Sequence, residues 1–82
     1  MNNNRFRLYH TDGCHLCELA QALIEQALLE GAQVSYQLID ICDQQTLADK
    51  YGTSIPVFSD GQRDLNWPFD LEQLQQFIGS SV

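Results

Sequence analysis

A chain of 82 residues is long enough for one small domain with one hydrophobic core, and 44% of its residues are hydrophobic. Its formal net charge of −7, with only 4 Lys and Arg residues, argues against a partner bound through nucleic-acid or lipid phosphates. The first residues lack the apolar region of a secretory signal, and no apolar run approaches the length of a membrane span. We therefore expect a cytoplasmic protein with no nucleic-acid or membrane partner.

The first half of the chain predicts a strand, a long helix and a second strand. Residues 1–4 are polar and expected to be frayed, whereas residues 5–10 alternate apolar with polar side chains, as a short strand does. From Leu16 onward the apolar residues follow the spacing of one face of an amphipathic helix, and Gly31 is a suitable residue to end it. The second strand is predicted over residues 34–41, which are rich in β-formers. The apolar face of the helix comprises Leu16, Leu19, Ala20, Leu23, Ile24, Ala27 and Leu28.

A short helix and a hairpin follow in the second half. Asp43 is expected to cap a helix that runs through Lys50. A third strand starts over residues 55–58, and a turn at residues 60–61 leads into a return strand over residues 63–67. The crossover between the first two strands makes them parallel, and the hairpin adds antiparallel strands, so the sheet is expected to be mixed.

The last helix begins after Pro68 breaks the return strand. Asp70 is expected to cap this helix, with Gln73 completing a capping box. The element order is then β-α-β-α-β-β-α. The buried face of the last helix is predicted to comprise Leu71, Leu74, Phe77 and Ile78.

Two cysteines, Cys14 and Cys17, stand three residues apart where the first strand gives way to the first helix. This spacing puts both on one side of the first helical turn, close enough for a disulfide. The free backbone N–H groups of that turn favour the thiolate form of the first sulfur. Because cytoplasmic thiols are kept reduced, the pair is more typical of catalysis or metal binding than of a structural staple. We interpret it as a dithiol redox centre.

The two cysteines are expected to have different roles. Cys14 precedes the helix and is the candidate nucleophile, while Cys17 lies one turn in and would resolve a mixed disulfide. A moderately lowered pKa is expected for Cys14, below the roughly 8.5 of a free thiol, because Asp12 and Glu18 oppose the helix N-terminus. His15 either stabilises the Cys14 thiolate when protonated or is a solvated residue of the first turn.

Three segments, residues 9–17, 51–57 and 67–70, resemble the short glutaredoxin-like proteins of the thioredoxin superfamily. They read Tyr-His-Thr-Asp-Gly-Cys-His-Leu-Cys, Tyr-Gly-Thr-Ser-Ile-Pro-Val and Trp-Pro-Phe-Asp. The likeness extends from Phe6 to Ile78. It implies a single α/β domain over residues 1–82 with a thioredoxin-like fold, namely a four-stranded mixed sheet with three helices. It also implies thiol-disulfide oxidoreductase chemistry at Cys14 and Cys17.

The resemblance further implies a cis Ile55–Pro56 bond facing the cysteine pair, with Ile55 offering its backbone to an extended substrate. The candidate substrate-binding residues are Tyr9, His15, Ile55, Pro56 and Trp67. Glutathione-binding relatives usually carry a basic residue before the cysteine pair and a Gly-Gly-x-Asp-type turn before the last helix, and this chain has neither. We therefore expect a monomer that prefers a protein or peptide disulfide to glutathione.

Cys42 leaves alternatives open. It is either a buried, unreactive thiol or a third ligand, beside Cys14 and Cys17, for zinc or an iron-sulfur cluster. In the second case a fourth ligand would have to come from His10 or His15. Our main interpretation needs no metal and no cofactor. A non-catalytic adapter that holds a peptide in the same groove is the other alternative.

Overall fold

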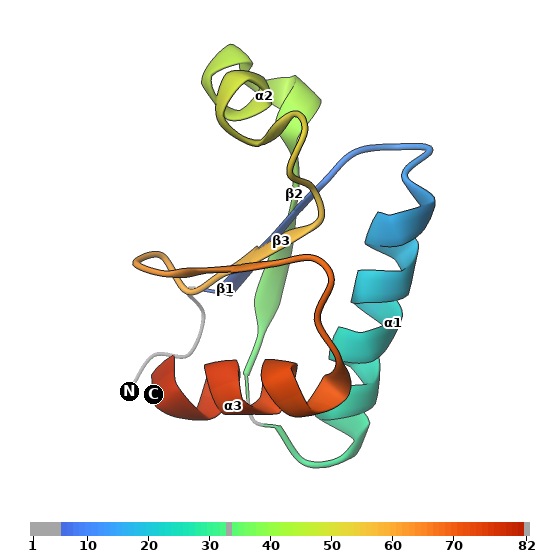
Figure 1. Ribbon diagram of the computed structural model, residues 1–82, viewed down its shortest axis with the longest axis vertical. Coiled ribbons are helices and arrows are strands. Elements are labelled where there is room, and N and C mark those ends of the chain that lie inside the picture. Colours follow the sequence, from blue (N-terminus) through green and yellow to red (C-terminus); the bar gives the residue numbers. More distant parts are fainter. Residues whose placement is uncertain (1–5, 33, 82) are drawn as a thin grey trace.

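The structure is a computed structural model, and it describes residues 6–32 and 34–81. Three α-helices and four strands follow one another in the order expected for a thioredoxin-like fold (Figure 1). Their bounds are β1 Phe6–His10, α1 His15–Leu29, β2 Tyr36–Asp40, the 3₁₀ turn η1 Ile41–Asp43, α2 Gln45–Tyr51, β3 Val57–Ser59, β4 Asp64–Asn66 and α3 Leu71–Ser81. The predicted fold class is confirmed, although the last three strands are shorter than the sequence indicated.

The sheet has the strand order β2-β1-β3-β4. β1 runs parallel to β2, with Leu8 opposite Leu38, and antiparallel to β3, with Leu8 opposite Phe58. β3 and β4 form the antiparallel hairpin. The carboxyl ends of β1 and β2 therefore lie at the same edge of the sheet, and the segment that carries the two cysteines leaves from that edge. Within the described residues, no helix is both long and apolar enough to cross a bilayer.

Two clusters of buried side chains form the core, one on each face of the sheet. Alternation along β1 turns Phe6 and Leu8 toward α1 and α3, whereas Tyr9 faces α2. The first cluster also contains Ala20, Ile24, Ala27, Phe58, Phe69, Leu74, Phe77 and Ile78, and the second Ile41, Tyr51 and Val57. In Figure 1, α1 and α3 lie close together, and α2 stands at the far end of the sheet.

The predicted buried face of α1 is confirmed at Ala20, Ile24 and Ala27, but it is wrong at Leu16 and Leu19. Its buried residues are Cys17, Ala20, Ile24 and Ala27, whereas Leu16 and Leu19 are 46% and 42% exposed. The helix is turned so that the line through Cys17 and Ala20 faces the sheet. Two leucines assigned to the core therefore stand at the surface beside the cysteine pair.

The predicted cap of the short helix is also wrong. Gln44, not Asp43, is the N-cap residue of α2, and its side chain makes no capping hydrogen bond. The chain forms η1 directly after β2, and the Cys42 N–H donates to Asp40 Oδ1 at 2.9 Å. Asp43 therefore lies inside this turn, too early in the chain to cap α2. By contrast, the capping box of α3 is confirmed, because the Gln73 N–H donates to Asp70 Oδ1 at 2.8 Å and the Asp70 N–H to Gln73 Oε1 at 3.0 Å.

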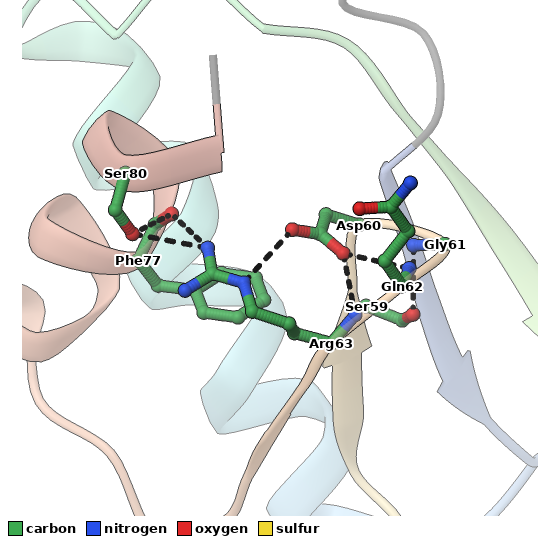
Figure 2. A network of polar contacts seen from close by, with 7 residues as sticks. All are labelled: Ser59, Asp60, Gly61, Gln62, Arg63, Phe77 and Ser80. Carbon is green, nitrogen blue, oxygen red and sulfur yellow. Dashed lines mark hydrogen bonds and ion pairs between the residues drawn. The ribbon is translucent and has the colours of Figure 1, made fainter.

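A polar network joins the β3–β4 hairpin to the end of α3 (Figure 2). Asp60 is 5% exposed, and its Oδ1 accepts the backbone N–H groups of Gln62 and Arg63 at 2.8 and 2.7 Å. The Arg63 Nε donates to Asp60 Oδ2 at 3.3 Å, and the guanidinium also donates to the Phe77 carbonyl and to Ser80 Oγ. This network lies at the edge of the sheet where β1 begins, opposite the edge with the cysteine pair.

Candidate functional site

Cys14 and Cys17 form a disulfide at the N-terminus of α1, with their Cα atoms 5.2 Å apart. Cys14 is the N-cap residue and has an extended backbone, and Gly13 before it has a φ of +80°, which a side chain would disfavour. Cys17 lies in the first turn and is 4% exposed, whereas Cys14 is only half-buried. The outer sulfur is therefore the one that a substrate reaches first.

The sulfur of Cys14 serves as the side-chain cap of α1. The Cys17 N–H donates to Cys14 Sγ at 3.1 Å, and the Glu18 N–H donates to the Cys14 carbonyl at 3.2 Å. A backbone N–H aimed at a sulfur stabilises negative charge on it, and the dipole of the helix acts in the same direction. Cys14 is thus placed to carry a thiolate, as attacking group or as leaving group.

His15 stands next to Cys14 in the chain, and its side chain contacts Glu18. Its Nδ1 lies 3.6 Å from Glu18 Oε1, and the two side chains are 78% and 73% exposed. A protonated imidazole here would pair with that carboxylate in water, where such pairs contribute little. The contact favours the solvated form of His15 that the sequence left open.

A pocket of about 190 Å³ opens on one side of the cysteine pair. Cys14 and Cys17 both line it, and the segment that connects β1 to α1 supplies most of the rest. Two acidic residues, Asp12 and Glu18, are part of the lining. The remaining lining residues are His10, Thr11, Gly13 and Gln21.

A larger hollow of about 420 Å³ lies on the other side of the Cys-x-x-Cys turn. It brings together Ile55 and Trp67, two of the predicted substrate-binding residues, with Leu16 from between the cysteines. Thr53, Ser54 and Asn66 complete its lining. The Ile55–Pro56 and Trp67–Pro68 peptide bonds are both cis. The sequence analysis did not identify Leu16 and Asn66 as site residues. Their positions could have indicated them, because Leu16 lies between the two cysteines and Asn66 directly precedes Trp67.

Pro56 and Tyr9 line neither of these pockets. Pro56 is fully buried beside Ile55, and its carbonyl accepts the Trp67 N–H at 3.3 Å. Tyr9 is 7% exposed and stacks on Tyr51 with ring centroids 4.3 Å apart, inside the second core cluster. Its position under α2 is that of a packing residue.

Cys42 is exposed, so the prediction of a buried thiol is wrong. η1 turns it outward at the end of β2, where its Sγ lies 3.3 Å from Thr11 Oγ1. Among the residues that the structure describes, no three or more His, Cys, Asp or Glu side chains gather where they could hold a metal ion. Cys14, Cys17 and Cys42 are therefore not brought together as such a group.

Two solved structures at least 33% identical to this chain have the same fold. The X-ray structure of the protein XcR50 from X. campestris is 33% identical, covers 92% of this chain and 96% of its own, and has a TM-score of 0.80. Its solution structure is 35% identical, with coverages of 93% and 94% and a TM-score of 0.75. The comparison with curated proteins gives no match.

A thioredoxin variant from Halobacterium salinarum NRC-1 extends the likeness to the wider fold. It is 24% identical, covers 98% of this chain and 75% of its own, and has a TM-score of 0.72, which shows a shared thioredoxin fold. The family model described as Glutaredoxin-like domain (DUF836) matches residues 5–79, from the start of β1 nearly to the end of α3. The chain therefore belongs to the glutaredoxin-like domain family DUF836.

Proposed function

We propose that this protein is a thiol-disulfide oxidoreductase that reduces protein or peptide disulfides through Cys14 and Cys17. One observation carries the proposal: the Cys17 N–H lies 3.1 Å from Cys14 Sγ at the start of α1, in a pair already within bonding distance. The outer sulfur is exposed to a substrate and stabilised as a thiolate, and the inner sulfur is positioned to attack it.

The reaction consists of two exchanges. In the first, the Cys14 thiolate attacks one sulfur of the substrate disulfide, forms a mixed disulfide and expels the other sulfur as a thiolate, which takes up a proton. In the second, the Cys17 thiol loses its proton and attacks Cys14 Sγ, which expels the remaining substrate sulfur. The substrate gains two electrons and two protons, and the enzyme is left with the Cys14–Cys17 disulfide. A dithiol reductant restores it by the same exchange in reverse.

The hollow beside Ile55 and Trp67 is the proposed place of the substrate chain. The Ile55 N–H donates to the Tyr51 carbonyl at 3.2 Å, so the Ile55 carbonyl is the backbone group that we expect to accept a substrate N–H. Apolar lining from Leu16, Ile55 and Trp67 suits a side chain next to the substrate cystine.

Glutathione is a poorer fit because none of the described Lys and Arg residues lines either pocket beside the cysteine pair. Lys50 Nζ lies 5.1 Å from the ring centre of Tyr51, and Arg63 is held by Asp60 and Ser80 in the hairpin network. Arg7 lines a separate hollow with Tyr9 on the α2 side of the sheet. Charge-assisted hydrogen bonds are worth roughly 1.5–3 kcal/mol each, so a tripeptide with two carboxylates is expected to bind weakly here.

The proposal is tested by turnover of two substrates under the same dithiothreitol concentration: a peptide with an intramolecular disulfide and a glutathionylated peptide. Wild type should reduce the first faster, Cys14→Ser should reduce neither, and Cys17→Ser should accumulate a mixed disulfide through Cys14. Efficient deglutathionylation that survives Cys17→Ser would mean a monothiol glutaredoxin activity and would contradict the substrate preference. No turnover by wild type would leave the adapter alternative, and metal analysis of anaerobically purified protein tests the metal alternative.

The proposal includes a cytoplasmic location and a monomeric state. The proposed reaction starts from the dithiol form, and the cytoplasm is a reducing compartment that keeps thiols in this form. Cell fractionation tests the location, and sedimentation equilibrium of the reduced protein tests the state.

A further inference from the structure

We infer that the site selects disulfides that carry a Lys or Arg close to the cystine, with Asp12 and Glu18 as the specificity-determining residues. This inference rests on the proposed function and names its substrate class. On the opposite side of the substrate cystine, we expect the site to favour an uncharged side chain. The two sides of the Cys-x-x-Cys turn thus have different chemistry, and each matches a different part of the substrate.

The acidic side is the pocket of about 190 Å³ that contains the cysteine pair itself. Asp12 precedes the pair by two residues and Glu18, whose Oε1 lies 3.6 Å from His15 Nδ1, follows it directly. Both residues line the pocket with Cys14 and Cys17. A substrate side chain that enters this pocket lies beside both cysteines, because both line it. The negative charges of Asp12 and Glu18 would attract a cationic substrate side chain in this pocket and repel an anionic one.

The uncharged side is the hollow of about 420 Å³ beyond Leu16. It has no charged residue in its lining, and three of its six lining residues are Leu16, Ile55 and Trp67. Leu19, one turn along α1 from Leu16, is 42% exposed and extends this apolar surface along the helix. No residue in this lining offers a charge of opposite sign, so an uncharged substrate side chain is favoured on this side over a charged one.

The excess of acidic residues in the whole chain adds to the negative charge of the site. The chain carries 11 Asp and Glu residues against 4 Lys and Arg residues. The described cations are Arg7, Lys50 and Arg63, and none of them lines either pocket beside the cysteine pair. The surface potential around Cys14 is therefore negative, which raises the encounter rate of a cationic substrate and lowers that of an anionic one.

The expected effect is an electrostatic preference of moderate size. Exposed charge pairs change binding by small factors each, and steering in the field of several charges adds to them. For two carboxylates we expect about a tenfold higher kcat/KM for a peptide with Lys beside its cystine than for the same peptide with Glu. In 1 M salt the Debye length falls to about 3 Å, and the ratio should approach one.

The test measures kcat/KM with dithiothreitol as reductant for two cyclic disulfide peptides that differ only in Lys or Glu next to the cystine. The variants are wild type, Asp12→Asn/Glu18→Gln, and the control Glu30→Gln/Glu72→Gln. The control changes the net charge equally but alters residues at the end of α1 and the start of α3, away from the cysteine pair. Because the readout is a ratio of two substrates on one variant, a general loss of activity cancels.

We expect the ratio of kcat/KM for the Lys peptide to that for the Glu peptide to stay unchanged in the control variant. In Asp12→Asn/Glu18→Gln we expect it to fall to about one. A ratio of one in wild type, with both peptides reduced, overturns the inference and leaves the proposed function intact. A ratio that survives in Asp12→Asn/Glu18→Gln also overturns it, because these two residues would then not set the preference. A ratio that falls equally in the control overturns it too, because net charge and not the pocket would then set the preference. If wild type reduces neither peptide, the proposed function itself is wrong.

Discussion

The backbone N–H of Cys17 donates to Cys14 Sγ at 3.1 Å, so one cysteine stabilises charge on the other. In the reduced protein we expect the same donor to favour the Cys14 thiolate, while Cys17, 4% exposed, is poorly accessible to a reagent. Iodoacetamide should therefore label Cys14 before Cys17 at every pH below the titration of a free thiol. Peptide mass spectrometry of briefly labelled protein measures this order. Earlier labelling of Cys17 would reverse the assigned roles.

Exposed Cys42 needs its own control in that experiment. Its sulfur lies beside Thr11, near the cysteine pair, and it will also react with iodoacetamide. A Cys42→Ser background removes it from the labelling pattern and keeps a hydroxyl beside Thr11. The order of Cys14 and Cys17 should be the same in this background.

Asp40 makes stability depend on acid pH. Its hydrogen bond from the Cys42 N–H holds the pKa of the carboxyl below its usual value, with smaller contributions from Thr11 and His10. A lowered folded pKa means that the carboxylate contributes stability above its unfolded pKa of about 4, and that this contribution is lost as pH falls through the folded value. Asp40→Ala should therefore destabilise the protein at pH 7 more than at pH 3.

Asp43→Ala provides the comparison, because Asp43 lies in the same turn and the sequence favoured it as a cap. Urea unfolding at the two pH values measures the difference in free energy of unfolding for both variants. Asp43→Ala should have the smaller effect at pH 7. An equal or larger effect would mean that Asp43 caps after all.

Patterns confined to a few neighbouring residues predicted their structure well. The capping box of Asp70 and Gln73 depends on two side chains and two N–H groups three residues apart, and it is present. The spacing of Cys14 and Cys17 equally predicted a pair at the first turn of a helix. The element order followed from turn residues and periodicity for the same reason.

Features set by distant contacts were not predictable from those patterns. Leu16 and Leu19 fit the apolar face of α1 by spacing, but the rotation of the helix is set by its contacts with the sheet and α3. Cys42 follows an apolar strand, and only the turn that Asp40 caps carries it to the surface. The second pocket joins Leu16 to Asn66, fifty positions later in the chain, a juxtaposition that no local pattern contains.

Tyr36 makes stability depend on alkaline pH as well. Burial, together with the hydrogen bond that its hydroxyl donates to Glu25 Oε2 at 2.6 Å, raises the pKa of Tyr36 to about 12. A raised folded pKa means that the neutral phenol contributes stability below the unfolded value of 10.0, and that this contribution is lost as pH rises toward 12. The difference in phenolate absorbance between wild type and Tyr36→Phe should titrate at a higher pH than the 10.0 of a free tyrosine. Glu25→Gln should bring that titration to lower pH.

The Asp60–Arg63 pair should matter for stability and not for disulfide exchange. The Asp60 side chain is 7% exposed and accepts hydrogen bonds from two backbone N–H groups as well as from Arg63 Nε. Arg63 also covers the ring of Phe77, with 4.9 Å between its Cζ and the ring centre, and donates to the Phe77 carbonyl. Removing the guanidinium takes away both the charge that faces a buried carboxylate and one contact that fastens the hairpin to α3. Arg63→Ala should therefore lower the free energy of unfolding by about 1–3 kcal/mol, measured in urea at pH 7.

Asp60→Asn separates the charge of this pair from its geometry. An amide keeps an oxygen that can accept the N–H groups of Gln62 and Arg63, so this variant should lose less stability than Arg63→Ala. The double variant should lose less than the sum of the two single changes, because each single change leaves the other partner without its charge. Peptide disulfide reduction by all three variants, measured below their unfolding temperatures, should equal that of wild type, since the network lies at the opposite edge of the sheet from Cys14. Strict additivity of the unfolding energies would show that Asp60 and Arg63 act independently, and a loss of activity in the folded variants would show that the hairpin influences the site.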